Sequence, residues 1–107
     1  MSTYSILIVD DEILTLSNLK KILEKEDYEV HVADTGETAL DVIERYKPHL
    51  VLLDLMLPGI SGIEVLKRVK DMERETIVIM MTAYEILEKA VEAMKLGAYD
   101  YLLKPFK

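Results

Sequence analysis

A run of four apolar residues that ends in a carboxylate limits the possible folds of this chain more than any other feature. Leu50–Leu53 are consecutive and apolar, which is typical of a strand covered on both faces in a parallel sheet. The run ends at Asp54, and the following segment, 57–62, contains one proline and two glycines, which favour a sharp turn. We therefore expect Asp54 at the carboxyl edge of the sheet centre, where open α/β sheets bind their ligands.

Length and composition indicate a single globular domain. The chain has 107 residues, of which 50% are hydrophobic and 31% charged, enough for one core and unlike a disordered segment. No apolar run approaches the roughly 20 residues of a membrane span, and the absence of cysteine excludes disulfides and thiolate metal sites. These features predict a cytoplasmic protein without membrane association. The net charge of −7 argues against direct nucleic-acid binding by this domain.

Strand and helix patterns alternate five times along the chain. Buried strands are predicted at 5–9, 50–54, 76–81 and 99–103, and the alternating segment 28–33, with Val30 and Val32 inward, is predicted to be an edge strand. Strand ends lie about 20–25 residues apart, the length of a right-handed crossover with a helix. The fold class is therefore predicted to be α/β, a flavodoxin-like, doubly wound, five-stranded parallel sheet of order 2-1-3-4-5. The fourth helix is expected to bury the stripe Leu87, Ala90, Val91 and Met94.

In this topology the carboxyl ends of four strands meet at one place and bring together Asp10, Asp11, Asp54, Thr82 and Lys104. Two carboxylates about 4 Å apart repel by ~4 kcal/mol at an effective dielectric constant of 20, and one lysine does not neutralise three of them. A hard divalent cation with oxygen ligands is the natural counterion, and Mg²⁺ fits best. Asp54 can then act as a nucleophile toward phosphorus and form an aspartyl phosphate, with Lys104 and Thr82 contacting the phosphoryl oxygens.

Four motifs in this order resemble the receiver domain of two-component response regulators: Leu7–Glu12, Asp54–Gly59 with Gly62, Met81–Ala83 and Lys104–Phe106. The resemblance runs from Ser5 to the last residue and implies one receiver domain over 1–107. It implies a phosphorylation-activated switch that accepts a phosphoryl group from a sensor histidine kinase and regulates an output domain or a downstream protein. Such a domain is not a conventional enzyme, although it helps to catalyse its own phosphotransfer and dephosphorylation.

The same resemblance assigns roles to individual residues. It implies Asp54 as the phosphoacceptor, Asp11 and Asp54 as direct Mg²⁺ ligands together with the backbone carbonyl of Met56, and Asp10 as a ligand through water. It also implies Lys104 and Thr82 as phosphoryl contacts, Thr82 as a switch residue, and Tyr101 as the aromatic residue that turns inward on activation. The segments 83–84 and 90–98 resemble receivers attached to ATPase-type transcription activators.

Two other functions are compatible with parts of this pattern. A pseudo-receiver would keep the fold as an interaction module without phosphorylation, but it has no reason to keep the acidic residues and Lys104 together. A haloacid-dehalogenase-type phosphatase would need two aspartates separated by one residue after the first strand, whereas Asp10 and Asp11 are adjacent.

The chain stops at Lys107, where the family continues into a fifth helix. We therefore expect the first helix to lie alone on its face of the sheet and the other three to share the opposite face. Leu102 or Leu103 should then be exposed, which favours a homodimer, an exchanged element between protomers or low stability. The Lys104–Pro105 peptide bond is expected to be cis.

Overall fold

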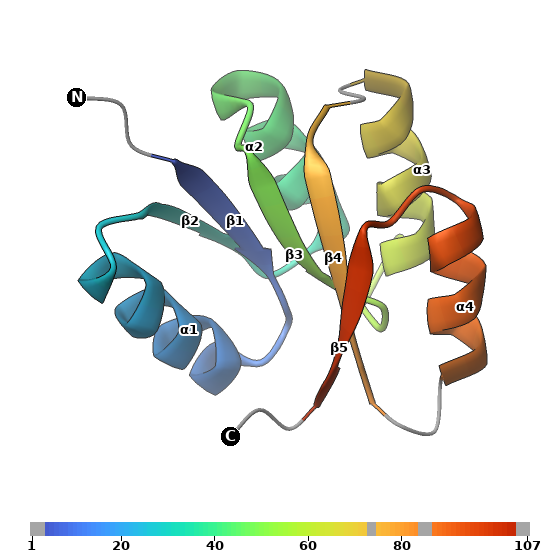
Figure 1. Ribbon diagram of the computed structural model, residues 1–107, viewed down its shortest axis with the longest axis horizontal. Helices are drawn as coiled ribbons and strands as arrows, with labels where there is room; N and C mark the ends of the chain where they lie inside the picture. Colours follow the sequence, from blue (N-terminus) through green and yellow to red (C-terminus); the bar gives the residue numbers. More distant parts are fainter. Residues whose placement is uncertain (1–3, 73–74, 84–86, 105–107) are drawn as a thin grey trace.

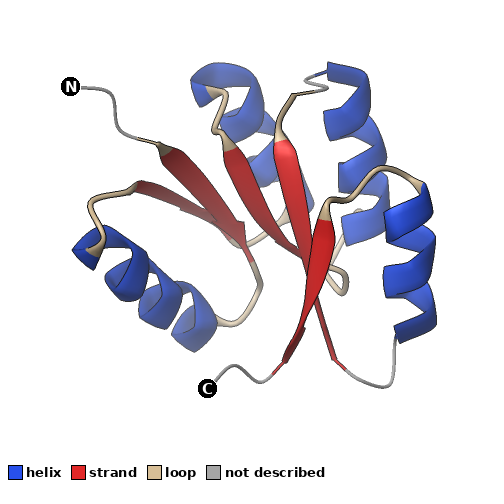
Figure 2. Cartoon of the chain, viewed as in Figure 1, coloured by secondary structure: helices blue, strands red, loops and turns tan. Residues whose placement is uncertain are grey.

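The computed structural model describes residues 4–72, 75–83 and 87–104. Strands and helices alternate along the chain, as predicted, and each strand except the last is followed by a helix (Figures 1 and 2). The strands are β1 (Ser5–Val9), β2 (Glu29–Ala33), β3 (Leu50–Asp54), β4 (Ile77–Ala83) and β5 (Asp100–Lys104), and the helices are α1 (Ile13–Lys25), α2 (Gly36–Tyr46), α3 (Gly62–Met72) and α4 (Leu87–Lys95).

The five strands form one parallel sheet in the order β2-β1-β3-β4-β5. The predicted fold class and strand order are therefore confirmed, and no fifth helix follows β5 within the described residues. The run that ends at Asp54 is the central strand, β3, with β1 on one side and β4 on the other. Its residues from Val51 to Asp54 are buried, because helices cover both faces of the sheet at this position.

The helices are divided unequally between the two faces, as expected. In Figure 1, α1 lies alone on one side of the sheet, and α2, α3 and α4 lie on the other. The core on the α1 side contains four buried residues, Ile6, Ile8, Leu52 and Met81. Leu16, Leu19 and Leu23 of α1 are partly buried and pack against them. The core on the opposite side is much larger and includes buried residues from α2, α3 and α4.

The alternation of side chains along each strand explains why the polar residues meet. Asp10 continues the series Ile6 and Ile8, and Asp54 continues Leu52, so both carboxylates lie on the α1 face of the sheet. Lys104 is paired with Ala83, two residues after the pair formed by Leu102 and Met81, which places it on the same face. Asp10, Asp54 and Lys104 thus reach one face of the sheet at its carboxyl edge. In Figure 1, the chain passes from this end of β1 into the beginning of α1.

One predicted apolar stripe is corrected by the structure, and a second is more exposed than expected. On α4, Val91 and Met94 are 48% and 38% exposed, and the buried positions among residues 88–95 are Ala90 and Ala93. The small alanine side chains face the sheet and allow α4 to pack closely on it, and the bulkier Val91 and Met94 side chains lie on other faces of the helix. In the edge strand β2, Val32 is paired with Ile8 and therefore lies on the same face as Val30, as predicted. Val32 is nevertheless 39% exposed, because β2 has a neighbouring strand on one side only.

Other expectations concern exposed or undescribed parts of the chain. Leu102 and Leu103 are each 42% exposed, as expected for a strand with little helical cover. The Lys104–Pro105 bond and Tyr84 lie outside the described residues. Among the helices that the structure describes, none is both long enough and apolar enough to cross a membrane.

Candidate functional site

Three carboxylates converge at the carboxyl edge of the sheet. Asp10, Asp11 and Asp54 each offer an oxygen, and these oxygens all lie within 4.8 Å of one another. Asp10 is completely buried and Asp54 is 6% exposed, whereas Asp11 is exposed. The sequence-based prediction that these residues meet is therefore confirmed in its geometry.

Backbone donors two residues further along hold the two buried carboxylates. The Glu12 amide donates to Asp10 Oδ1 at 2.9 Å, and the Met56 amide donates to Asp54 Oδ1 at 3.1 Å. Such local bonds from an aspartate to its own backbone are typical of chain turns after a strand. They leave Oδ2 of each aspartate directed toward other partners.

Lys104 provides the positive charge of the site. Its Nζ lies 2.6 Å from Asp10 Oδ2, 3.1 Å from Asp54 Oδ2 and 3.2 Å from Glu12 Oε1. The Lys104 side chain is only 17% exposed, so its ammonium is largely removed from water at the end of β5. The prediction that Lys104 joins Asp10 and Asp54 is confirmed.

Burial and charge act on the protonation of these groups in opposite directions. Burial raises the pKa of Asp54 from 3.8 to about 6, because the loss of solvation and the nearby Asp10 outweigh the donors from Met56 and Lys104. Burial alone would lower the pKa of Lys104, but attraction to Asp10 and Asp54 outweighs it and raises this pKa above its ordinary value. The lysine is therefore charged, and Asp54 is a carboxylate that is easier to protonate than usual.

The donor set fits a hard divalent cation. Asp10 Oδ2 is buried and, among the described residues, accepts no hydrogen bond of good geometry, so its contact is the ion pair with Lys104. Three carboxylates with one neighbouring lysine leave the site with excess negative charge, and carboxylate oxygens are the ligands that Mg²⁺ prefers. The residues present are therefore compatible with the predicted Mg²⁺ site.

The remaining predicted residues, Thr82, Met56 and Tyr101, are positioned as follows. Thr82 is fully buried at the end of β4, one residue beyond Met81, the strand partner of Asp54. Met56 has a largely exposed side chain, and its amide contacts Asp54. Tyr101 is half-buried and packs against the core on the side of α2, α3 and α4. The phosphoryl contact of Thr82, the Met56 carbonyl ligand and the switch role of Tyr101 remain predictions.

Glu12 belongs to the site although the sequence interpretation gave it no role of its own. It occupies the N-cap position of α1, yet its side chain makes no capping hydrogen bond to the helix and contacts Lys104 instead. A glutamate at a position where serine, threonine, aspartate or asparagine is preferred is a signal that could have identified it.

The turn after Asp54 is held in place by a close backbone approach. A Cβ on Gly62 would lie 2.2 Å from the backbone oxygen of Asp54 and 2.8 Å from Leu55 Cα. Gly59, in the same turn, has a φ of 76°, which favours glycine. The two glycines read from the sequence as turn residues thus allow α3 to begin directly against the end of β3.

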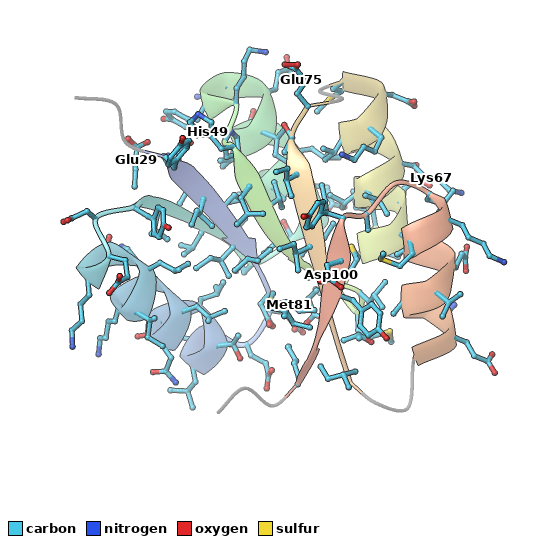
Figure 3. All side chains as sticks on the ribbon, in the orientation of Figure 1. Glu29, His49, Lys67, Glu75, Met81 and Asp100 are labelled. Atoms are coloured by element: carbon cyan, nitrogen blue, oxygen red, sulfur yellow. The ribbon has the colours of Figure 1, made fainter. Side chains whose placement is uncertain are left out.

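The two histidines lie away from this site. His49 accepts a hydrogen bond from the Ser5 amide at 3.0 Å through Nδ1. Figure 3 shows His49, like Glu29 and Glu75, on the side of the sheet where the strands begin, away from their carboxyl ends. His31 does contact a carboxylate, since its Nε2 lies 2.8 Å from Glu29 Oε2, and its ring stacks on Tyr46. These contacts involve no second histidine and give no metal site among the described residues.

Comparison with known proteins identifies the family. The model of the response regulator receiver domain matches residues 6–107. The regulatory protein AtoC of Escherichia coli strain K12 is 44% identical over 101 residues, which are 94% of this chain and 22% of AtoC. The sporulation initiation phosphotransferase F of Bacillus subtilis strain 168 is 42% identical over 106 residues, covering 99% of this chain and 86% of that protein.

Solved structures agree with this result. The response regulator receiver domain protein (CheY-like) from Methanospirillum hungatei JF-1 has a TM-score of 0.94 and 39% identity, and the match covers 99% of this chain and 85% of that one. The receiver domain of NtrX from Brucella abortus has a TM-score of 0.90 and 38% identity over 95% of this chain and 87% of the other. The chain thus spans most of these separate receiver domains but about a fifth of AtoC. It belongs to the response regulator receiver domain family and takes part in phosphorylation-based signalling.

Proposed function

We propose that this receiver accepts a phosphoryl group on Asp54 from a sensor histidine kinase in a Mg²⁺-dependent reaction, and that the modification changes its interaction with an output domain or a downstream partner. The observation that carries the proposal is the buried Asp54 carboxylate, with Lys104 Nζ 3.1 Å from Oδ2 and two more aspartates within 4.8 Å. The domain acts in the cytoplasm in this proposal, and self-association remains a separate prediction.

The residues of the site have different tasks in the proposed reaction. An Asp54 oxygen attacks phosphorus on the phosphohistidine, a new O–P bond forms, and the N–P bond breaks with its electron pair returning to the imidazole. In this proposal Lys104 contacts the incoming phosphoryl oxygens, and Thr82 at the end of β4 supplies a hydroxyl. Asp11, Asp54 and the Met56 carbonyl would hold Mg²⁺ directly and Asp10 would hold it through water, and the ion would supply positive charge for the phosphoryl oxygens.

The pseudo-receiver is the alternative from another class. A pure interaction module gains nothing from two buried carboxylates, since burying a charge is costly unless a partner compensates it. The fit of Asp10, Asp54 and Lys104 to one another therefore favours a site that is used chemically.

The test is phosphorylation by a small phosphodonor, acetyl phosphate, in the presence of Mg²⁺. We expect one acid-labile phosphoryl group per chain by intact mass spectrometry, no labelling of Asp54→Asn, and joint loss of Mg²⁺ binding and labelling in Asp11→Ala. Asp34→Asn is the matched control, because Asp34 is an exposed aspartate that follows β2 and makes no described contact with Lys104.

Two results would count against the proposal. Labelling of Asp54→Asn at full stoichiometry would show that another residue is the acceptor. Failure of the unmodified chain to bind beryllofluoride, a phosphoryl mimic, at saturating Mg²⁺ would support the pseudo-receiver instead.

A further inference from the structure

The ammonium group of Lys104 is surrounded by carboxylates in this state. An ammonium has three protons to donate, and Lys104 Nζ has three carboxylate neighbours, those of Asp10, Asp54 and Glu12, at 2.6, 3.1 and 3.2 Å. A phosphoryl oxygen that approaches Lys104 must therefore replace one of these contacts.

The three contacts differ in how easily they can be released. Asp10 is fully buried and its Oδ2 has no other described partner, so its release would leave an unpaired buried charge. Asp54 is itself the proposed acceptor and stays bonded to the phosphoryl group, so it does not leave the site. The Glu12 side chain is 65% exposed, and water can solvate its carboxylate as soon as Lys104 leaves.

The position of Glu12 supports a role in holding Lys104. Glu12 is the N-cap residue of α1, where its carboxylate could accept a helix amide, yet it makes no side-chain capping bond. Its Oε1 accepts instead from Lys104 Nζ at 3.2 Å and from Thr15 Oγ1 at 3.3 Å. The Thr15 hydroxyl thus helps to keep the carboxylate over the end of β5, 92 residues away in the sequence.

We infer that Glu12 is a positioning residue: it holds the Lys104 ammonium in the unphosphorylated state, competes with the phosphoryl group for it, and thereby slows phosphorylation of Asp54. The inference rests on the proposed function, because the competitor is the phosphoryl group on Asp54. Contacts made in the resting state and lost in the transition state raise the barrier to reaction. Weakening the Glu12 contact should therefore speed phosphoryl acceptance.

The first measurement is the rate of phosphorylation by acetyl phosphate at saturating Mg²⁺. Glu12→Gln keeps the size of the side chain and removes its charge, and we expect a rate about two- to fivefold higher than that of the unmodified chain, the range of an exposed ion pair. Asp34→Asn removes one negative charge at the same edge without a described contact to Lys104, and its rate should stay near that of the unmodified chain. Glu12→Ala should match or exceed Glu12→Gln.

The second measurement observes Lys104 directly and does not depend on rates. The Lys104 side-chain signals are observed in ¹³C,¹⁵N-labelled protein and assigned with Lys104→Arg. They should differ between the chain without a substitution and Glu12→Gln when neither protein carries a phosphoryl group or beryllofluoride. In the complexes with Mg²⁺ and beryllofluoride, the signals of the two proteins should coincide, because Lys104 has left Glu12 in both.

The outcomes separate the inference from the proposed function. If the unmodified chain is not phosphorylated at all, the proposed function fails and the inference fails with it. If the chain is phosphorylated but Glu12→Gln reacts no faster than Asp34→Asn, only the inference is overturned. The inference would also be overturned if the Lys104 signals of Glu12→Gln and of the chain without a substitution were identical before beryllofluoride is added. The same holds if these signals differed as much with beryllofluoride as without it.

Discussion

At the scale of single residues, Asp54 combines burial with a charge that its proposed reaction needs. The pKa of Asp54 is raised from 3.8 to about 6, first because of burial. Between these pH values the Asp54 carboxyl binds more protons in the folded chain than in the unfolded chain. The contribution of Asp54 to the free energy of unfolding therefore falls as pH rises from about 4 to about 6 and stays lower above it. A pKa difference of about two corresponds to roughly 2–3 kcal/mol of the free energy of unfolding.

We therefore expect Asp54→Asn to be more stable than the unmodified chain by about 2 kcal/mol at pH 7 without divalent cations. The gap should close toward pH 4, because Asp54 is then protonated in the folded chain. Urea unfolding in a chelating buffer across this pH range measures both values, with Asp34→Asn as the control for charge alone. An Asp54→Asn protein that is less stable at pH 7, or a gap that does not change with pH, would contradict the expected penalty.

At the scale of elements, the connection from β3 to α3 depends on one backbone contact. Gly62→Ala would place Cβ against the Asp54 backbone oxygen and Leu55 Cα, and backbone atoms cannot move away cheaply. We expect a loss of about 3 kcal/mol in the free energy of unfolding and a matching loss of Mg²⁺ affinity, because Asp54 is displaced.

Gly36→Ala is the matched control for Gly62→Ala, because Gly36, the first residue of α2, is also closely approached by neighbouring atoms. Its new Cβ would meet atoms of the Ile60 and Val65 side chains at 2.6–2.7 Å, and side chains can adjust more easily than backbone. We expect a loss of about 1 kcal/mol, with Mg²⁺ binding preserved. Equal losses in the two variants would show that the backbone approach at Gly62 is not what limits the turn.

The end of α1 offers a prediction with the opposite sign. Asp27 has a φ of 67°, and the Asp27 and Tyr28 amides bond back to the carbonyls of Glu24 and Leu23, which is a common helix ending. Glycine adopts this conformation without strain, and an acidic residue is unfavourable at a helix C-terminus. Asp27→Gly should stabilise the chain by about 1 kcal/mol in thermal or urea unfolding. Asp27→Asn should give a smaller gain, and a destabilised Asp27→Gly would refute this account.

At the scale of the whole molecule, the two faces of the sheet contribute unequally to stability. Leu66 of α3 is completely buried in the larger core, whereas Leu16 of α1 is partly buried against the smaller one. Truncation costs the lost transfer free energy and the cavity that remains. We expect Leu66→Ala to lose about 3 kcal/mol and Leu16→Ala about 1 kcal/mol in urea unfolding. Similar losses for both would show that α1 is packed as well as the opposite layer.

The sequence by itself determined the fold and the principal members of the site. Consecutive apolar residues in Leu50–Leu53, alternating residues in β2 and regularly spaced turns follow from local rules, and the handedness of parallel crossovers leaves few strand orders. Once the strands are parallel, their carboxyl ends must meet at one edge. The convergence of Asp10, Asp54 and Lys104 could therefore be predicted without coordinates.

Only the tertiary structure decided which side chains touch and how strongly. Whether Val91 or Ala93 faces the core depends on how α4 is rotated on the sheet, and helical spacing alone leaves that rotation open. The contact of Glu12 with Lys104 and the raised pKa of Asp54 depend on distances of a few ångströms between distant segments and on the exclusion of water. Local sequence patterns specify which elements form and where they end, whereas burial and charge pairing are properties of the packed chain.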